Sequence, residues 1–272
     1  MPLWQISPRA EIGCRVRISP FCVIEDQVKV GDDCQLGPGV VLYAGTEIGP
    51  GCHLGPGVVI GGRPMDTAYQ GEPTRVRIGS NNDLREFVTI HRSTGPETAT
   101  LLGNDNLIMA YVHIAHNCRI GTHTVITNAC QLGGYVEVGD RAVIGGMTGI
   151  HQHVRIGTLA MVGACSYLSR DLPPYMLGAG VPFRVRGLND IGLRRNGFSA
   201  ETRRILRAVH RLVYRSALGL RDALEQVARR YPDSPEVREF VRFCRRTSRG
   251  LQLSNPQADE LSPPANAAWE EQ

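Results

Sequence analysis

An aliphatic residue returns at every sixth position of this chain from Ile12 to Leu168. Each repeat position is Ile, Leu or Val, and the register breaks only between 60 and 78 and between 90 and 102. Neither the period of a helix nor the alternation of an ordinary strand keeps such a register. A short fixed repeat is typical of a parallel β-helix, in which three hexapeptides close a triangular coil and stacked coils share one core.

Two segments interrupt the repeat and are predicted to leave it as loops. Residues 61–77 contain Pro64 and Pro73, and proline cannot donate the backbone hydrogen bond that a stacked strand requires. A shorter break at 93–99 skips one repeat. Because long loops on a rigid repeat scaffold often carry function, the first segment is a candidate part of a site.

The six-residue pattern stops near Pro173, and amphipathic helical patterns follow it. Helices are predicted at about 200–216, 220–231 and 236–246, the first capped by Ser199 and the third by Ser234. The sequence therefore predicts a mainly β protein. Its expected parts are a parallel β-helix over 1–182 with an extruded loop at about 61–77, a small α-helical domain over 183–250, and a disordered tail over 251–272.

The predicted helical domain is rich in arginine. Between Arg184 and Arg249 there are 17 arginines and 7 acidic residues, a net charge of +10, whereas the whole chain carries only +4. The rest of the chain therefore sums to about −6 by subtraction (4 − 10). This charge favours an anionic partner, although many arginines on such a domain simply face water. Nucleic acid is disfavoured, because no recognition motif or set of stacking aromatic residues accompanies the charge.

Compartment and metal content can also be judged from the sequence. No basic and apolar leader opens the chain, and no apolar run approaches the length of a membrane span, so a soluble cytoplasmic protein without an integral membrane segment is expected. Five of the eight cysteines share the position four residues after a repeat aliphatic, which indicates inward packing. No Cys-x-x-Cys pair is present, so a cysteine-based metal site is not expected.

The histidines are the main candidates for chemistry. His113, His116 and His123 fall in one short stretch, and any one of them alone is more often a bystander than a catalyst. If three repeats close one coil, however, His116, Gly134 and Gln152 stack in one column on the outside of the prism. An imidazole would then lie beside a bare main-chain N–H and an amide, which favours catalysis.

A set of ordered motifs adds a family resemblance. The motifs are Gly71-Glu72-Pro73-Thr74-Arg75, Val88-Thr89-Ile90-His91-Arg92, His113-Ile114-Ala115-His116, Gly145-Gly146-Met147-Thr148, Asp171-Leu172-Pro173-Pro174-Tyr175, Asn189-x-x-Gly192-Leu193-Arg194-Arg195 and Thr247-x-Arg249-Gly250. In this order they resemble the UDP-N-acetylglucosamine O-acyltransferase family, which catalyses the first step of lipid A biosynthesis in lipopolysaccharide-producing cells. The resemblance covers about residues 8–251 and implies a left-handed coil.

The resemblance implies direct transfer of a 3-hydroxyacyl chain from acyl carrier protein to the 3-hydroxyl of UDP-N-acetylglucosamine. No cofactor is implied beyond the acyl-phosphopantetheine of the carrier protein, and no covalent enzyme intermediate or metal is expected. His116 matches the general base and Asp66 the carboxylate that orients it. Gly134 matches the main-chain N–H that binds the thioester oxyanion.

Further positions match the binding of substrate. His113 and Gln152 match substrate contacts, and Asn189 and Arg195 match residues that hold the nucleotide from a neighbouring subunit of a homotrimer. Ala164 stands where the family has glycine at the boundary of the acyl channel. The arginine-rich helical domain is expected to receive the acidic carrier protein.

Several positions depart from the family pattern. Met65 stands at a substrate-contacting position where Gln is usual, Ala68 replaces a lysine, Tyr135 a histidine, and Ile191 a glutamate. These changes leave open a UDP-3-amino sugar as the acceptor, which would give an amide. A zinc-dependent carbonic anhydrase on the same prism, with three histidines converging on the metal at a subunit interface, and a catalytically idle structural or carrier-binding trimer are further alternatives.

Overall fold

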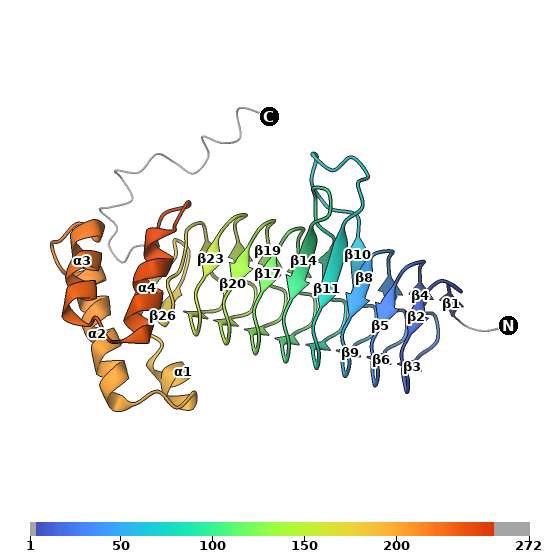
Figure 1. Cartoon of the computed structure of the whole chain (residues 1–272), viewed down its shortest axis with the longest axis horizontal. Coiled ribbons are helices and arrows are strands. Elements are labelled where there is room, and N and C mark those ends of the chain that lie inside the picture. Colours follow the sequence, from blue (N-terminus) through green and yellow to red (C-terminus); the bar gives the residue numbers. More distant parts are fainter. Residues whose placement is uncertain (1–3, 253–272) are drawn as a thin grey trace.

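The computed structural model describes residues 4–252, and these form the expected left-handed parallel β-helix followed by an α-helical domain (Figure 1). Three parallel sheets make the faces of a triangular prism, which we name faces A, B and C.

Face A contains β1 (Gln5–Ile6), β4 (Val23–Ile24), β7 (Val41–Leu42), β10 (Val59–Gly62), β13 (Thr89–His91), β16 (His113–Ile114), β19 (Gln131–Leu132), β22 (Gly149–Ile150) and β25 (Tyr167–Leu168). Face B contains β2 (Glu11–Ile12), β5 (Lys29–Val30), β8 (Thr46–Ile48), β11 (Arg75–Ile78), β14 (Ala99–Leu102), β17 (Arg119–Ile120), β20 (Glu137–Val138) and β23 (Arg155–Ile156). Face C contains β3 (Arg17–Ile18), β6 (Gln35–Leu36), β9 (His53–Leu54), β12 (Asp83–Leu84), β15 (Leu107–Ile108), β18 (Val125–Ile126), β21 (Val143–Ile144), β24 (Met161–Val162), β26 (Met176–Ala179) and β27 (Arg184–Leu188).

Each coil places its repeat aliphatic inward and the preceding residue outward. From Ile24 to Leu168 the repeat aliphatics are buried, whereas Ile12 and Ile18 in the open first coil are only partly covered. The corners turn through a residue with left-handed backbone three places after the aliphatic, as at Asn117 (φ 59°) and Tyr135 (φ 60°). The side chain just before this corner residue therefore lies outside the core.

Successive strands of a face are three repeats apart, except at the two predicted interruptions. Val59 of β10 pairs with Thr89 of β13, a step of 30, and Thr89 pairs with His113 of β16, a step of 24. Both extra segments leave the prism at the corner between faces A and B, and the longer one projects beside β10 and β11 in Figure 1.

The long loop is tied to its surroundings at two points. The ring of Tyr69 is buried and lies 5.7 Å from the guanidinium groups of both Arg63 and Arg92. The Glu72 carboxylate accepts a hydrogen bond of 2.7 Å from Gly95 N–H in the second loop. That bond lowers the pKa of Glu72, so the carboxylate stays charged and holds the two loops together.

Past the prism, β26 and β27 pair antiparallel, so the sheet continues to Leu188, beyond the predicted boundary at 182. The helices are α1 (Asp190–Arg195), α2 (Ala200–Arg215), α3 (Leu220–Arg230) and α4 (Pro235–Arg245). The last three lie within one residue of the predicted ranges, and α1 was not predicted. Among the residues that the structure describes, no helix combines the length and apolar character needed to cross a bilayer.

The C-terminal end of α4 is fixed to the prism. The Arg155 guanidinium donates hydrogen bonds to the carbonyl groups of Phe243 and Arg246 at the end of the helix, where carbonyl groups lack their full set of intrahelical partners. Leu251 bridges to Asp171 and is buried, so the predicted disordered tail does not begin at 251. Residues 253–272 of that predicted tail lie outside the described residues.

Candidate active site

The predicted column exists along the corner between faces A and B. Strands β16, β19 and β22 pair in register, each three repeats after the last, which stacks His116, Gly134 and Gln152 two places after their aliphatics. The main chain confirms the stacking, because Tyr135 N–H donates to the His116 carbonyl at 3.0 Å and His153 N–H to the Gly134 carbonyl at 2.9 Å.

The His116 ring packs directly on Gly134. A Cβ atom at position 134 would lie 2.5 Å from both Nε2 and Cε1 of the imidazole, so only glycine leaves room for this ring position. Within the described part of the chain, the Gly134 N–H has no hydrogen-bond partner, although the N–H groups of both its neighbours are bonded. The residue that packs on the Nε2–Cε1 edge of the ring thus carries a free main-chain donor.

The opposite nitrogen of His116 is held by an amide. His116 Nδ1 lies 3.0 Å from Asn117 Oδ1 and 3.6 Å from Asp66 Oδ2, so the amide oxygen is within hydrogen-bond distance and the carboxylate is not. Thr94 fixes the amide, because its N–H donates to Asn117 Oδ1 at 2.8 Å and its carbonyl accepts from Nδ2 at 2.9 Å. This network assigns the proton to Nδ1 and leaves the Nε2 lone pair available as a base.

Asn117 was missed by sequence reasoning, which assigned the orienting role to Asp66 alone. Asp66 does reach the ring from the long loop, as predicted, but as an outer neighbour whose Oδ1 accepts from Ala68 N–H at 3.0 Å. The sequence position of Asn117 could have identified it. It directly follows His116 and lies at a left-handed corner, a conformation that asparagine tolerates well.

A second group of histidines lies one strand away on face A. The His113 ring faces outward, with Nδ1 at 2.8 Å from Thr89 Oγ1, and contacts the ring of His91 edge-on at 5.0 Å. Burial, reinforced by His91 and His116, lowers the pKa of His113 to about 4, and burial also lowers the pKa of His91. Both rings are therefore neutral near pH 7 and offer hydrogen bonds without competing for the proton of His116.

Tyr135 closes the column above His116. Its ring meets His116 edge-on at 5.4 Å and stacks on His153 at 4.6 Å. Gln152 is exposed at the next step of the column, and Met65 is 71% exposed on the loop. One chain thus brings together His113, His116, Gly134, Gln152 and Asp66.

The remaining predicted residues lie on other corners of the prism. Asn189 caps α1, where its Oδ1 accepts from Gly192 N–H at 3.1 Å and its Nδ2 donates to Leu159 O at 2.8 Å, at the corner between faces B and C. Arg195 ends the same helix. Ala164 is exposed at the corner between faces C and A. Within one chain, none of these three shares the corner that carries His116.

The three histidines proposed for zinc do not converge in the chain. His123 lies at the corner between faces B and C and pairs with Asp105 at 3.9 Å, whereas His113 and His116 belong to face A and its edge. Among residues 4–252, no group of three or more His, Cys, Asp or Glu is arranged to hold a metal ion.

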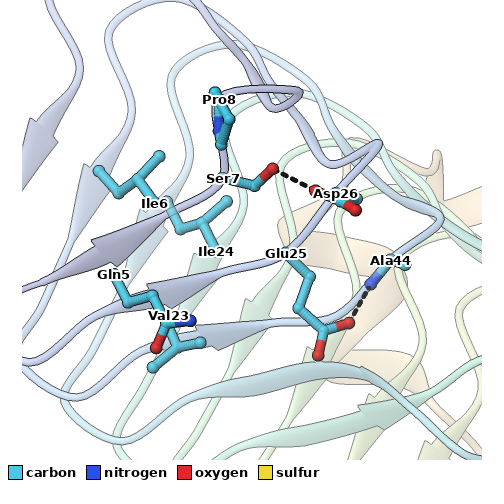
Figure 2. Close-up of a pocket in the computed structure, with 9 residues that line it drawn as sticks. All are labelled: Gln5, Ile6, Ser7, Pro8, Val23, Ile24, Glu25, Asp26 and Ala44. Atoms are coloured by element: carbon cyan, nitrogen blue, oxygen red, sulfur yellow. Dashed lines mark hydrogen bonds between the residues drawn. The ribbon is translucent and has the colours of Figure 1, made fainter.

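A separate hollow of about 530 Å³ lies at the amino-terminal end of the same corner (Figure 2). Its carboxylates already have partners, because Asp26 accepts from the Ser7 hydroxyl and Glu25 accepts from Ala44 N–H at 3.0 Å. It contains no histidine, so it lacks the groups that make the His116 column reactive.

Sequence comparison relates the chain to acyltransferases. The family model described as Udp N-acetylglucosamine O-acyltransferase, Domain 2, matches residues 171–252, and the bacterial transferase hexapeptide model matches 9–44, 28–62 and 99–134. An acyl-[acyl-carrier-protein]–UDP-N-acetylglucosamine O-acyltransferase of Thermodesulfovibrio yellowstonii is 44% identical over 247 residues, which cover 90% of this chain and 96% of that protein.

Solved structures show the same similarity. A UDP-N-acetylglucosamine acyltransferase from Bacteroides fragilis aligns with a TM-score of 0.90 at 38% identity, over 92% of this chain and 98% of that one. The enzyme from Francisella novicida aligns with a TM-score of 0.91 at 31% identity, over 98% of both chains.

Proposed function

The chain belongs to the UDP-N-acetylglucosamine O-acyltransferase family, and on that premise we propose that His116 and Gly134 together catalyse acyl transfer from acyl carrier protein to the sugar 3-hydroxyl. The enzyme is an acyl-[acyl-carrier-protein]–UDP-N-acetylglucosamine O-acyltransferase, as its relatives are named, and its expected place is the first step of lipid A biosynthesis. The observation that carries the mechanism is the packing of the His116 ring edge on the bare Cα of Gly134.

The reaction follows from the two groups that this contact brings together. His116 Nε2 takes the proton of the sugar 3-hydroxyl while the hydroxyl oxygen attacks the thioester carbonyl carbon. The Gly134 N–H donates to the oxyanion of the tetrahedral intermediate. When the carbon–sulfur bond breaks, the imidazolium returns the proton to the phosphopantetheine sulfur, which leaves an ester and free carrier protein.

The neutral histidines suit the binding of an uncharged sugar. His113 and Gln152 flank the catalytic pair along face A and its edge, and His113 remains uncharged near pH 7 because burial lowers its pKa to about 4. Met65 replaces a polar contact on the loop, so in this chain the loop contributes the Asp66 carboxylate and an apolar side chain.

A homotrimer would complete the site. Asn189, Arg195 and Ala164 lie on other corners than His116, so a neighbouring copy is needed to bring them to the substrate. A ridge of exposed apolar side chains runs along the corner between faces C and A, as expected for a surface that another subunit covers. Its members are Phe21, Phe87, Tyr111 and Met147. Sedimentation should therefore give three times the chain mass of 29.8 kDa.

Mass spectrometry of the product tests the proposed reaction. With UDP-N-acetylglucosamine and 3-hydroxyacyl carrier proteins, we expect one ester-linked acyl group at the 3-position and release of the free carrier thiol. A higher kcat/KM for the 3-amino analogue, with an amide product, would assign that acceptor instead. If neither sugar is acylated, the protein would instead be a catalytically idle structural or carrier-binding trimer.

Asn117 should matter more than Asp66 to the orientation of His116. Replacing Asn117 with alanine should lower kcat about tenfold, the effect of one hydrogen bond of about 1.4 kcal/mol. Asn117→Asp keeps an acceptor oxygen for His116 Nδ1 and should recover part of the lost kcat. Asp66→Asn should change kcat less than Asn117→Ala, and the reverse order would give the orienting role to Asp66.

Ala164 should shorten the preferred acyl chain. An extra methyl group at the boundary of an acyl channel excludes the last carbons of a longer chain, because a packed slot does not accept added volume freely. Donors of 10, 12 and 14 carbons should be compared, and Ala164→Gly should move the preference to a longer donor. A clear preference of the unaltered enzyme for 14 carbons would contradict this role.

A further inference from the structure

A hollow of about 310 Å³ lies on the helical domain between α3 and α4. Its floor is apolar and consists of Ala228, Tyr231, Pro232, Val237 and Val241. Its rim is Arg238, Arg242 and Arg245, all exposed and spaced by four and then three residues, so that they lie on one side of α4.

This hollow has an unbalanced positive charge. No carboxylate lines it, and within the described part of the chain neither Arg242 nor Arg245 forms an ion pair. Arg238 donates to the Pro232 carbonyl at 2.8 Å, which holds its guanidinium at the rim. The neighbouring hollow beside α3 differs, because Glu225 lines it and pairs with Arg221 at 3.3 Å. The first hollow therefore suits an apolar group that is flanked by negative charges.

The chain supplies such a group in its own tail. Residues 253–272 contain four carboxylates, at Asp259, Glu260, Glu270 and Glu271, and neither lysine nor arginine. Trp269 directly precedes the last two glutamates. The family model of the C-terminal domain ends at Gln252 and so does not cover this acidic segment.

The tail starts close enough to reach the hollow. Gln252 N–H donates to the Asp171 carbonyl at 2.9 Å, and Asp171 lies beside Arg155, which holds the end of α4. Helix α4 has 11 residues and is therefore about 16 Å long. The 17 steps from 252 to 269 (269 − 252) extend to at most about 60 Å, several times that length.

We propose that Trp269, with Glu270 and Glu271, docks into the hollow between α3 and α4 and thereby competes with the acidic carrier protein for the arginine surface. A tethered segment acts at an effective concentration in the millimolar range, so even weak docking occupies the hollow for much of the time. The consequence for catalysis rests on the proposed function, whereas the docking itself does not.

Tryptophan fluorescence tests the docking without any assay of activity. The chain has two tryptophans, and Trp4→Phe leaves Trp269 as the reporter. Its emission should lie at shorter wavelength than that of the free peptide 253–272, and Arg238→Gln/Arg242→Gln/Arg245→Gln should shift it to the value of the peptide. The matched triple change Arg204→Gln/Arg211→Gln/Arg215→Gln on α2 removes the same charge and should leave the emission unchanged.

Three results would overturn the docking: emission equal to that of the free peptide, the same response to both triple changes, or a shift that disappears on dilution and so reports contact between assemblies.

The competition is tested by removing 253–272 or by changing its four acids to amides. Either change should lower the KM for the acyl carrier protein about two- to fivefold at low salt, with kcat unchanged. The difference should vanish near 1 M salt, where the Debye length is about 3 Å. An unchanged KM would overturn the competition, and an enzyme without transfer activity would leave the fluorescence result standing.

Discussion

His116→Ala should lower kcat for acyl transfer by about 10²–10⁴-fold, the contribution expected of a positioned general base. The sugar hydroxyl is too weak an acid to attack a thioester unaided, and His116 is the ring whose Nε2–Cε1 edge packs on Gly134. The ring lies outside the aliphatic core, so the melting temperature should change little. Steady-state kinetics with the 3-hydroxyacyl carrier protein gives the measurement.

His123→Ala is the matched control for this change. His123 is exposed at another corner, and among residues 4–252 its side chain pairs only with Asp105, so its removal should leave kcat within about twofold of the unaltered enzyme. Equal losses in both variants would instead favour a site that needs both rings, as a zinc-dependent carbonic anhydrase would. Unchanged transfer by His116→Ala would remove His116 from the mechanism altogether.

Gly134→Ala should lower kcat by about 10²-fold or more, although it keeps the main-chain N–H. The added Cβ would meet Nε2 and Cε1 of His116 at 2.5 Å, so the ring must move, and a displacement of about 1 Å is enough for such a loss. The backbone at 134 is not left-handed, so alanine brings no backbone strain of its own. The KM for the sugar should change much less than kcat.

Gly62→Ala gives a control in the same column. There the nearest atom to an added Cβ is His91 Nε2 at 3.5 Å, an ordinary contact, so kcat should be nearly unchanged. A normal kcat for Gly134→Ala would show that the His116 ring does not work from the position seen in the structure.

The fold was predictable because one period controls the burial of every coil. Once three repeats close a coil, the neighbours of any outward side chain follow from its number, and this is how His116, Gly134 and Gln152 were grouped. The three longer helices were predictable from their apolar stripes and from the Ser199 and Ser234 caps. Helix α1, with 6 residues, is too short to show a stripe, and the sequence suggested only a substrate role for Asn189, not its role as the cap of this helix.

The details of the site were less predictable, because they depend on irregular backbone. The choice between Asn117 and Asp66 as partner of His116 depends on the path of the long loop and on Thr94, which no repeat specifies. The pKa of His113 likewise depends on its burial and on the nearby rings of His91 and His116, which the repeat alone does not specify. The period also does not show that Asn189, Arg195 and Ala164 need a second subunit.

The stacking of coils sets a limit on how such an enzyme can evolve. Neighbouring strands lie about 4.8 Å apart, so heights along the A/B corner come in whole multiples of that interval. Inserted residues that do not complete a full coil form a loop outside the prism, as they do between β10 and β13 and again between β13 and β16. Adaptation to an acceptor or acyl group of slightly different size must therefore come from substitution of single side chains at fixed coil positions. The other route is a change in the loops that leave the prism.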